Sequence, residues 1–134
     1  MQYLAAYVAT AVVFLLIDYL WLAHIAKNFY FSRLGHLLAD NPNLGVAAVF
    51  YAVYVIGVVI FAVAPALQSG TWKTALIYGA LFGFFCYATY DFTNLATLRD
   101  WPITVAVVDV IWGTVLTGTS ALLGFLIVKQ FYPG

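Results

Sequence analysis

Long apolar runs separated by short polar connections make up most of this chain of 134 residues. A helix that crosses a bilayer needs roughly 20 mostly apolar residues. Four stretches reach this length, at about 3–24, 44–67, 73–97 and 102–128. The pattern predicts an all-α bundle of four transmembrane helices in a single integral membrane domain, with both termini on the same side. We expect the first run to be a membrane helix and not a cleaved signal peptide, because no basic residue precedes it.

Capping residues predict where the later spans begin. Asn41 is followed by Pro42 at the start of the second span, and Asp100 precedes Pro102 at the start of the fourth. A polar cap satisfies free N–H groups of the first turn, and proline suits that turn. Thr71 takes the same position before the third span.

The first connection, residues 27–40, has its own pattern. Apolar residues recur at helical spacing with polar residues between them, which is typical of a short helix lying in the membrane interface. Such a helix between the first and second spans could cover part of the bundle. A simple extension of the first span followed by a loop is the alternative.

The amino-acid composition limits which molecules the protein can bind. The chain is 66% hydrophobic and only 7% charged, with a formal net charge of zero. We expect membrane lipid as the partner and no nucleic acid, because there is no charged field to attract it. Cys86 is the only cysteine, so an intrachain disulfide or a Cys-pair metal site is excluded. We expect no metal site, and the sequence leaves any cofactor unidentified.

The cations barely favour one orientation. Lys27, Arg33 and Arg99 lie in the first and third connections, against Lys73 and Lys129 on the side of the termini. This bias weakly places the termini outside. With so small a difference in charge, the protein could insert in both orientations. An antiparallel homodimer is therefore possible.

Three carboxylates interrupt the apolar runs. Asp18, Asp91 and Asp109 fall inside the first, third and fourth spans. A carboxylate at the centre of a membrane helix costs about 2.5–3.5 kcal/mol on an insertion scale. At 1.5 Å per residue, each lies about 9 to 11 Å below the membrane face that carries the first and third connections. We expect them to converge on a shared polar pocket and take them as the candidate catalytic residues.

Other polar and aromatic side chains accompany these carboxylates. Asp18 and Asp109 each precede a tryptophan by three residues, and Asp91 precedes Asn94 at the same spacing, which places each pair on one helix face. We expect the tryptophans to wall the pocket, and Asn94 and Arg99 to orient a ligand. The candidate binding residues are Trp21, His24, Tyr90, Asn94, Arg99 and Trp112.

Simpler roles compete with these. The aspartates could serve as hydrogen-bonding links between helices, and each tryptophan alone is typical of packing or of an aromatic belt. His24, Lys27 and Arg99 near an interface commonly contact headgroups. Gly79 and Gly83 form a G-x-x-x-G spacing that favours close helix packing, within the chain or with a second protomer. Packing within the chain is the preferred interpretation.

The strings IDYLWL, YDFTNLATLRDWP and VDVIWG, which contain the three aspartates, resemble a family of short bacterial predicted membrane proteins catalogued as a domain of unknown function. The resemblance covers essentially the whole chain. It implies a multi-pass, four-helix protein of the bacterial cytoplasmic (inner) membrane, and it brings no catalytic role with it. In overall plan the chain is also similar to small multidrug transporters, although the local sequences differ.

The leading functional hypothesis is a site that binds or processes a small amphipathic or lipid-like molecule, reached from the interface beneath residues 27–40. In it, Asp91 and Asp109 handle protons or hold a polar head. A dimeric proton-coupled transporter for a small solute is the alternative. A structural subunit of a membrane complex is a third hypothesis. Whether the protein is an enzyme stays open.

Overall fold

The computed structural model describes residues 1–133, and all regular secondary structure in that range is helical. Four helical spans are long and apolar enough to cross a membrane: Gln2–Ile25, Leu44–Ser69, Trp72–Thr97 and Ile103–Phe131. The prediction of an all-α bundle with four spans is confirmed. The observed ends lie within three residues of those expected from the apolar runs.

Two spans contain a wide helical turn. The first consists of α1 (Gln2–Leu20) followed by the π-helical turn η1 (Trp21–Ile25). The second consists of α3 (Leu44–Val58), the π-helical turn η2 (Val59–Val63) and α4 (Ala64–Ser69). A π-helical turn shifts the helix face presented by the following residues. The third and fourth spans, α5 (Trp72–Thr97) and α6 (Ile103–Phe131), are uninterrupted.

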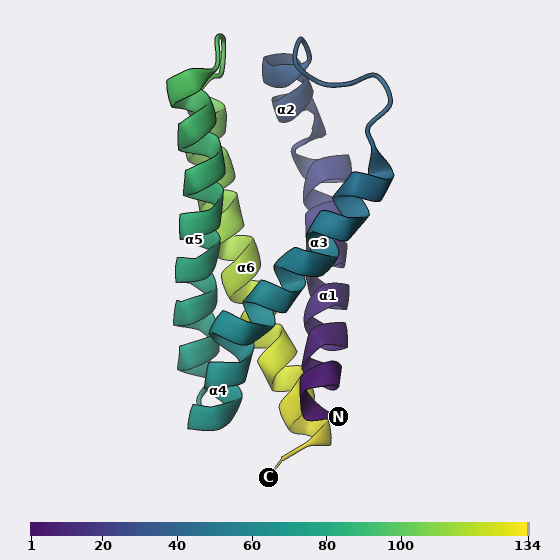
Figure 1. Ribbon diagram of the computed structural model, residues 1–134, viewed down its shortest axis with the longest axis vertical. Coiled ribbons are helices and arrows are strands. Elements are labelled where there is room, and N and C mark those ends of the chain that lie inside the picture. Colours follow the sequence, from purple (N-terminus) through teal and green to yellow (C-terminus); the bar gives the residue numbers. More distant parts are fainter. Residues whose placement is uncertain (134) are drawn as a thin grey trace.

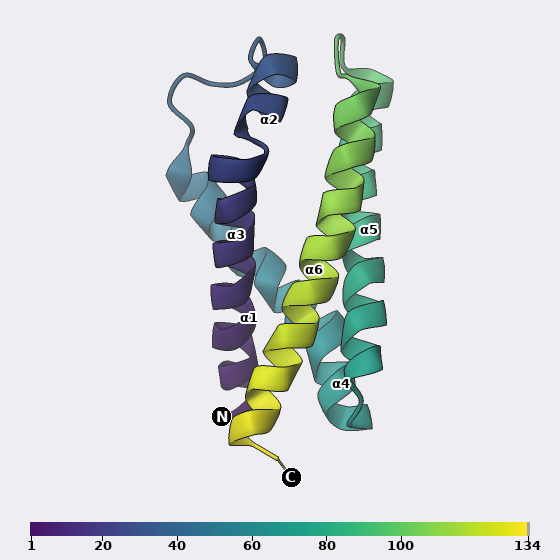
Figure 2. The ribbon, with the colours of Figure 1, turned by 180° about the vertical axis from the view of Figure 1, so that it is seen from behind.

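The helices are arranged so that the bundle is tight at one end and opens at the other (Figure 1). Both termini lie at the lower end of Figure 1, where α6 reaches α1, as the view from behind also shows (Figure 2). The second span crosses the bundle obliquely: α4 lies beside α5, whereas the first residues of α3 lie far from α5. The short helix α2 (Lys27–Leu34) occupies the upper end, so the expected helix between the first two spans is present.

Glycines allow α5 and α6 to pack closely. A Cβ atom added to Gly79 would lie 2.7 Å from the Cβ of Ala121, and one added to Gly83 would lie 2.7 Å from the Cβ of Thr117. Real Cβ atoms do not approach this closely, so only glycine fits at both positions. The G-x-x-x-G spacing therefore serves packing within the chain.

Two of the three expected caps are wrong. The residue that caps α3 is Asn43, not Asn41: its Oδ1 accepts a hydrogen bond from the backbone N–H of Val46 at 3.0 Å. A cap must directly precede the first helical residue, and Asn41 lies two residues too early. The start of α6 has no side-chain cap, because Asp100 instead takes a positive φ of 60° in the connection. The third expectation is confirmed, since Thr71 Oγ1 accepts from the backbone N–H of Lys73 at 3.1 Å.

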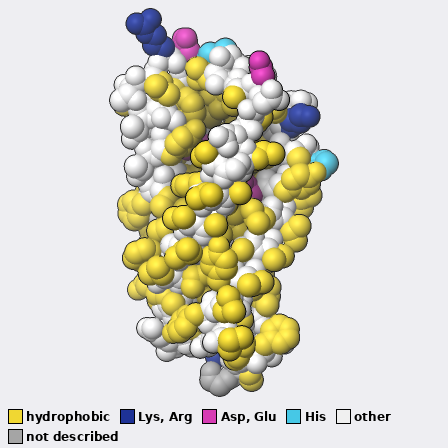
Figure 3. All heavy atoms as spheres, turned by 45° about the vertical axis from the view of Figure 1, so that its right-hand side comes forward, with side chains coloured by type: hydrophobic (Ala, Val, Ile, Leu, Met, Phe, Trp, Pro, Cys, Tyr) yellow, Lys and Arg dark blue, Asp and Glu magenta, His cyan; other side chains and the backbone are white. Residues whose placement is uncertain are grey.

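The outer surface suits lipid. Large apolar side chains are exposed along all four spans, for example Val8, Val53, Leu81 and Val115. In the space-filling view, hydrophobic side chains are spread over the visible face, whereas most of the visible Lys, Arg, Asp and His side chains lie toward its upper end (Figure 3). This distribution is that of a multi-pass membrane protein.

Candidate functional site

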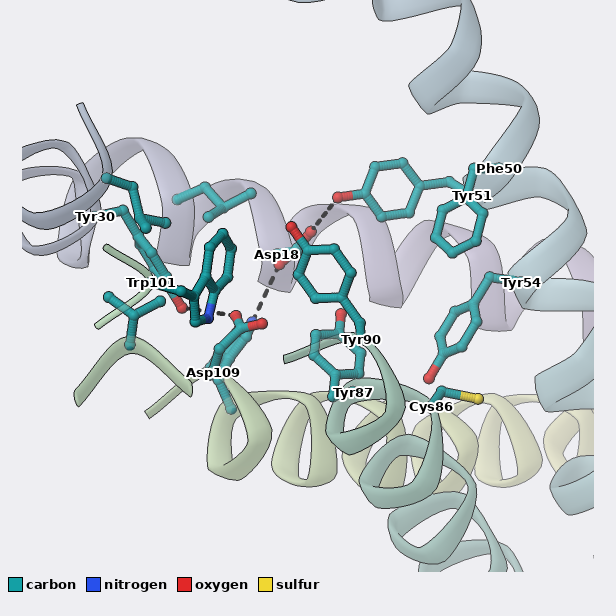
Figure 4. Close-up of a pocket in the computed structure, with 14 residues that line it drawn as sticks. Asp18, Tyr30, Phe50, Tyr51, Tyr54, Cys86, Tyr87, Tyr90, Trp101 and Asp109 are labelled. Atoms are coloured by element: carbon teal, nitrogen blue, oxygen red, sulfur yellow. Dashed lines mark hydrogen bonds between the residues drawn. The ribbon is translucent and has the colours of Figure 1, made fainter. Parts of the chain in front are cut away.

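A cavity of about 500 Å³ lies between the four spans, beneath α2 and toward the open end of the bundle. Figure 4 shows side chains from every span, and from the α5–α6 connection, pointing into it. Two carboxyl groups, Asp18 and Asp109, line it. Its aromatic lining consists of Tyr30, Phe50, Tyr51, Tyr54, Tyr87, Tyr90, Trp101 and Trp112. The cavity is therefore mainly aromatic and carries its polar groups in one region.

Asp18 is held by two neutral donors from other spans. Its carboxylate is 6% exposed. Oδ2 accepts a hydrogen bond from the hydroxyl of Tyr51 on α3 at 2.9 Å, and Oδ1 accepts from Nε1 of Trp112 on α6 at 3.1 Å. Both oxygens of this buried group are thus partnered, as a carboxylate removed from water requires. Asp18 thereby connects three spans.

Asp109 is held from above by α2. Its Oδ1 accepts a hydrogen bond from the hydroxyl of Tyr30 at 2.9 Å, and the oxygen of Tyr30 in turn accepts from Nε1 of Trp21 at 3.2 Å. Burial, and then the neighbouring carboxylate of Asp109, raise the pKa of the Tyr30 phenol. Tyr30 consequently stays protonated and remains a donor across the ordinary pH range.

Asp91 on α5 does not line the cavity, and no described residue donates a hydrogen bond to it. Its side chain is fully buried, and within residues 1–133 neither of its oxygens accepts a hydrogen bond. The carboxyl group of Asp91 lies beside that of Asp109. Two ionised carboxylates are both acceptors only, so a hydrogen bond between them requires one proton. The pair can therefore hold a proton between α5 and α6.

The other predicted site residues divide into two groups. Tyr90 lines the cavity, and Trp21 lies just outside it. Asn94 is half-buried one turn beyond Tyr90 on α5. In contrast, His24 and Arg99 are exposed, and the ring of His24 packs edge-on against Tyr19 away from the cavity. The structure thus brings the three aspartates and both tryptophans together and leaves His24 and Arg99 outside.

Sequence reasoning missed the tyrosines that complete the site. Tyr51 and Tyr54 carry the only polar side-chain atoms in the stretch 44–67, and that is the signal that could have identified them. Tyr30 lies in the segment 27–40, where apolar and aromatic residues recur at helical spacing, and nothing in that pattern singles out its hydroxyl. In each case the tyrosine and its hydrogen-bond partner belong to different helices, so the contact cannot be recognised from a local sequence pattern.

The cavity opens sideways between α3 and α5. Phe50 on α3 and Tyr90 on α5 both line it and are 61% and 57% exposed. Its floor is closed by Tyr54, whose hydroxyl forms a hydrogen bond of 2.9 Å with Thr117 Oγ1 and whose ring stacks on Phe82.

The lining carries no positive charge. Among the described residues that border the cavity there is no Lys, Arg or His. Nor do residues 1–133 contain a group of three His, Cys, Asp or Glu side chains placed to hold a metal ion. The donors to Asp18 and Asp109 are a phenol or an indole, all of them neutral.

Comparison with known proteins identifies the family. The family model described as "Predicted membrane protein (DUF2177)" matches residues 3–126, which is nearly the whole chain and includes all three aspartates. No curated protein and no solved structure matches the chain. The match agrees with the four apolar spans found in the structure. The chain therefore belongs to this family of membrane proteins of unknown function.

Proposed function

We propose that the protein binds or processes a small amphipathic or lipid-like molecule in this cavity, within the bacterial cytoplasmic membrane. One observation carries the proposal: an aromatic cavity that contains the carboxyl groups of Asp18 and Asp109 opens between α3 and α5, where Phe50 and Tyr90 are exposed. A molecule dissolved in the bilayer could enter there without crossing water. Polar, aromatic-walled openings of this kind are rare on a lipid-facing surface, where ionisable groups mark functional sites.

The dimensions fit such a ligand. Sites for small molecules typically have volumes of about 300–1,000 Å³, are mainly apolar and contain a few placed polar groups. The cavity, of about 500 Å³, meets each condition. The rings of Tyr54 and Tyr87 would contact the apolar part of the ligand, and Asp18 and Asp109 its polar head. Asp91, behind Asp109, would accept or return a proton.

A photo-crosslinking experiment tests whether the cavity is occupied. An alkyl alcohol bearing a benzophenone group would be added to phosphatidylcholine vesicles that contain the protein, and the crosslinked peptides would be mapped by mass spectrometry. We expect labelling to concentrate on the stretch 86–90 of α5. Cys86→Phe places a ring in the cavity and should abolish this labelling, because Cys86 lines it. Val115→Phe adds the same ring at a lipid-facing position that is 53% exposed, and should leave the labelling unchanged.

Labelling that simply follows lipid exposure, with α1 and α5 equally marked and Cys86→Phe without effect, would contradict the proposal. Retained folding of Cys86→Phe would be checked by its elution as a single species and by its helical circular dichroism.

One observation favours a second function, a dimeric proton-coupled transporter. Asp91 and Asp109 can hold one proton between them, and a solute that competes for Asp109 would release it. Solute-dependent proton release from the purified protein, lost in Asp91→Asn, is the expected result. The dimer would have to use α6 or another outer surface, because Gly79 and Gly83 already pack against α6 of the same chain. A strictly monomeric protein that releases no proton would exclude this function.

A further inference from the structure

Charge in the cavity indicates what kind of head group it accepts. Asp18 and Asp109 border the cavity, and Asp91 lies beside Asp109, while no basic side chain of the described residues borders it. The five Lys and Arg residues lie elsewhere: Lys27, Arg33, Lys73 and Arg99 are exposed, and Lys129 lies in the last turn of α6 at the other end of the bundle. A cavity with carboxyl groups and no counter-charge attracts a cation and repels an anion.

The hydrogen bonds support the ionised form of Asp18 in particular. Tyr51 and Trp112 each donate to one of its oxygens, and donors to a carboxylate stabilise its charge. These donors supply no positive charge of their own. Because no basic side chain of the described residues borders the cavity, a positive charge beside Asp18 would have to come from a bound ligand.

Asp109 and Asp91 are less fully partnered. Among residues 1–133, the hydroxyl of Tyr30 donates to Oδ1 of Asp109. Asp91 is fully buried and receives none among residues 1–133. Such an unpartnered carboxyl group is expensive in a low-dielectric interior. A positively charged group near Asp109 would lower this cost for both carboxyl groups.

The walls suit an organic cation better than a metal ion. Residues 1–133 hold no group of three acidic, His or Cys side chains that could ligate a metal, whereas eight aromatic side chains surround the carboxylates. Aromatic faces attract alkylammonium groups, and the attraction grows when the pair is removed from water. The same rings provide apolar surface for an alkyl chain attached to the ammonium group.

We propose that the ligand of this cavity is an amphipathic organic cation, an alkylammonium compound, whose charged head lies between Asp18 and Asp109 and whose chain extends past Phe50 and Tyr90 toward the bilayer. The proposal rests on the proposed function, because it names the class of molecule that enters the same cavity.

Quenching of tryptophan fluorescence tests it. Three probes with the same brominated undecyl chain would be compared: a trimethylammonium, a glucoside and a sulfate. The protein would be held in nanodiscs of phosphatidylcholine, which has no net charge. Trp101 and Trp112 line the cavity, so a probe bound there quenches them in a saturable manner, whereas a probe merely dissolved in lipid quenches linearly. Trp72→Phe removes an exposed tryptophan at the far end of α5 and lowers the background.

We expect saturable quenching by the trimethylammonium probe and no saturable quenching by the sulfate. Half-maximal quenching by the trimethylammonium probe should need a concentration about tenfold or more below that of the glucoside, and tenfold corresponds to about 1.4 kcal/mol. Asp18→Asn with Asp109→Asn should remove this preference. Asp40→Asn with Asp100→Asn removes the same number of charges at exposed positions at the same end and should retain it.

The outcomes separate the two proposals. Equal saturable binding of the trimethylammonium and glucoside probes would overturn the cation inference and leave the proposed function standing. Linear quenching by all three probes would overturn both. Should the cavity double variant fail to fold, the comparison of the three probes on the otherwise unaltered protein still decides.

Discussion

The indole rings of Trp21 and Trp112 are stacked, with ring centroids 4.2 Å apart and an interplanar angle of 8°. They belong to different spans, and each follows an aspartate by three residues. Trp112 donates directly to Asp18 on the first span, whereas Trp21 reaches Asp109 on the fourth span through the hydroxyl of Tyr30. The repeated Asp-x-x-Trp spacing thus forms a crossed connection between η1 and α6, in which each tryptophan serves the aspartate of the other span.

This crossed arrangement predicts unequal costs for the two tryptophans. Trp112→Phe keeps an aromatic ring but leaves buried Asp18 without one of its two donors. We expect the free energy of unfolding to fall by about 1–3 kcal/mol, the cost of removing a partner from a buried charged group. Trp21→Phe loses only a bond to a neutral hydroxyl and should cost about 0.5–1.5 kcal/mol. Denaturation by SDS in mixed micelles measures both, and an equal or reversed cost would contradict the arrangement.

Tyr30 is predicted to hold α2 over the cavity. Tyr30→Phe removes the hydrogen bond that the Tyr30 hydroxyl donates to Asp109. We expect faster amide hydrogen exchange in Lys27–Leu34 while the exchange of α5 and α6 is unchanged, since elements held by few bonds open locally. Tyr19→Phe, at a residue that is 60% exposed on the outer side of α1, is the control. Unchanged exchange in α2 would show that apolar contacts such as Leu34 hold it instead.

Asp91→Asn is predicted to stabilise the protein, unlike the same change at Asp18. Asp91 is fully buried without a donor and lies beside Asp109, so an amide would donate to Asp109 and remove a buried acid. We expect the free energy of unfolding at neutral pH to rise by about 1 kcal/mol or more. At Asp18 the amide N–H₂ would face the donor of Tyr51 or Trp112, and stability should fall. A loss of stability in Asp91→Asn would mean that its carboxyl group has an essential partner.

The sequence was sufficient to predict the spans, because hydrophobic length alone decides what crosses a bilayer. It also predicted that Asp18 and Asp109 come together, and both line the same cavity. It could not show which side chains from other elements meet them. Tyr51 and Tyr30 donate to these aspartates because α3 crosses the bundle obliquely and α2 continues beyond η1 at its upper end. No local sequence pattern predicts either direction.

Arg99 is a further residue whose direction the local sequence does not determine. Its position just beyond the third span is compatible with a side chain that points either inward or outward. In the structure Arg99 is exposed. Its predicted role in orienting a ligand stays a prediction, whereas the exposed side chain gives the cavity no positive charge.

The cap of α3 offers a direct comparison between sequence expectation and structure. Asn43→Ala removes the hydrogen bond from the N–H of Val46, and should lower the free energy of unfolding by about 0.5–2 kcal/mol. Asn41→Ala changes an exposed residue outside the helix and should have no measurable effect. Thermal unfolding followed by circular dichroism distinguishes them. A larger cost at Asn41 would restore the sequence-based expectation and place the start of the helix two residues earlier.

Packing between α5 and α6 leads to a prediction about glycine. An added methyl group on Gly83 would lie 2.7 Å from both Cβ and Oγ1 of Thr117, and α6 cannot move away without losing its contact with the rest of α5. We therefore expect Gly83→Ala to lower the free energy of unfolding by about 1–3 kcal/mol through overpacking. Gly45 at the start of α3 is the matched control, because a methyl group there would meet only Asn43 Oδ1, at 3.4 Å. Gly45→Ala should stabilise the helix by up to about 1 kcal/mol, since alanine favours helix over glycine. If both variants gained stability, the two helices would have to be separable at Gly83, and the cavity between α3, α5 and α6 would lack the rigid wall on which its geometry depends.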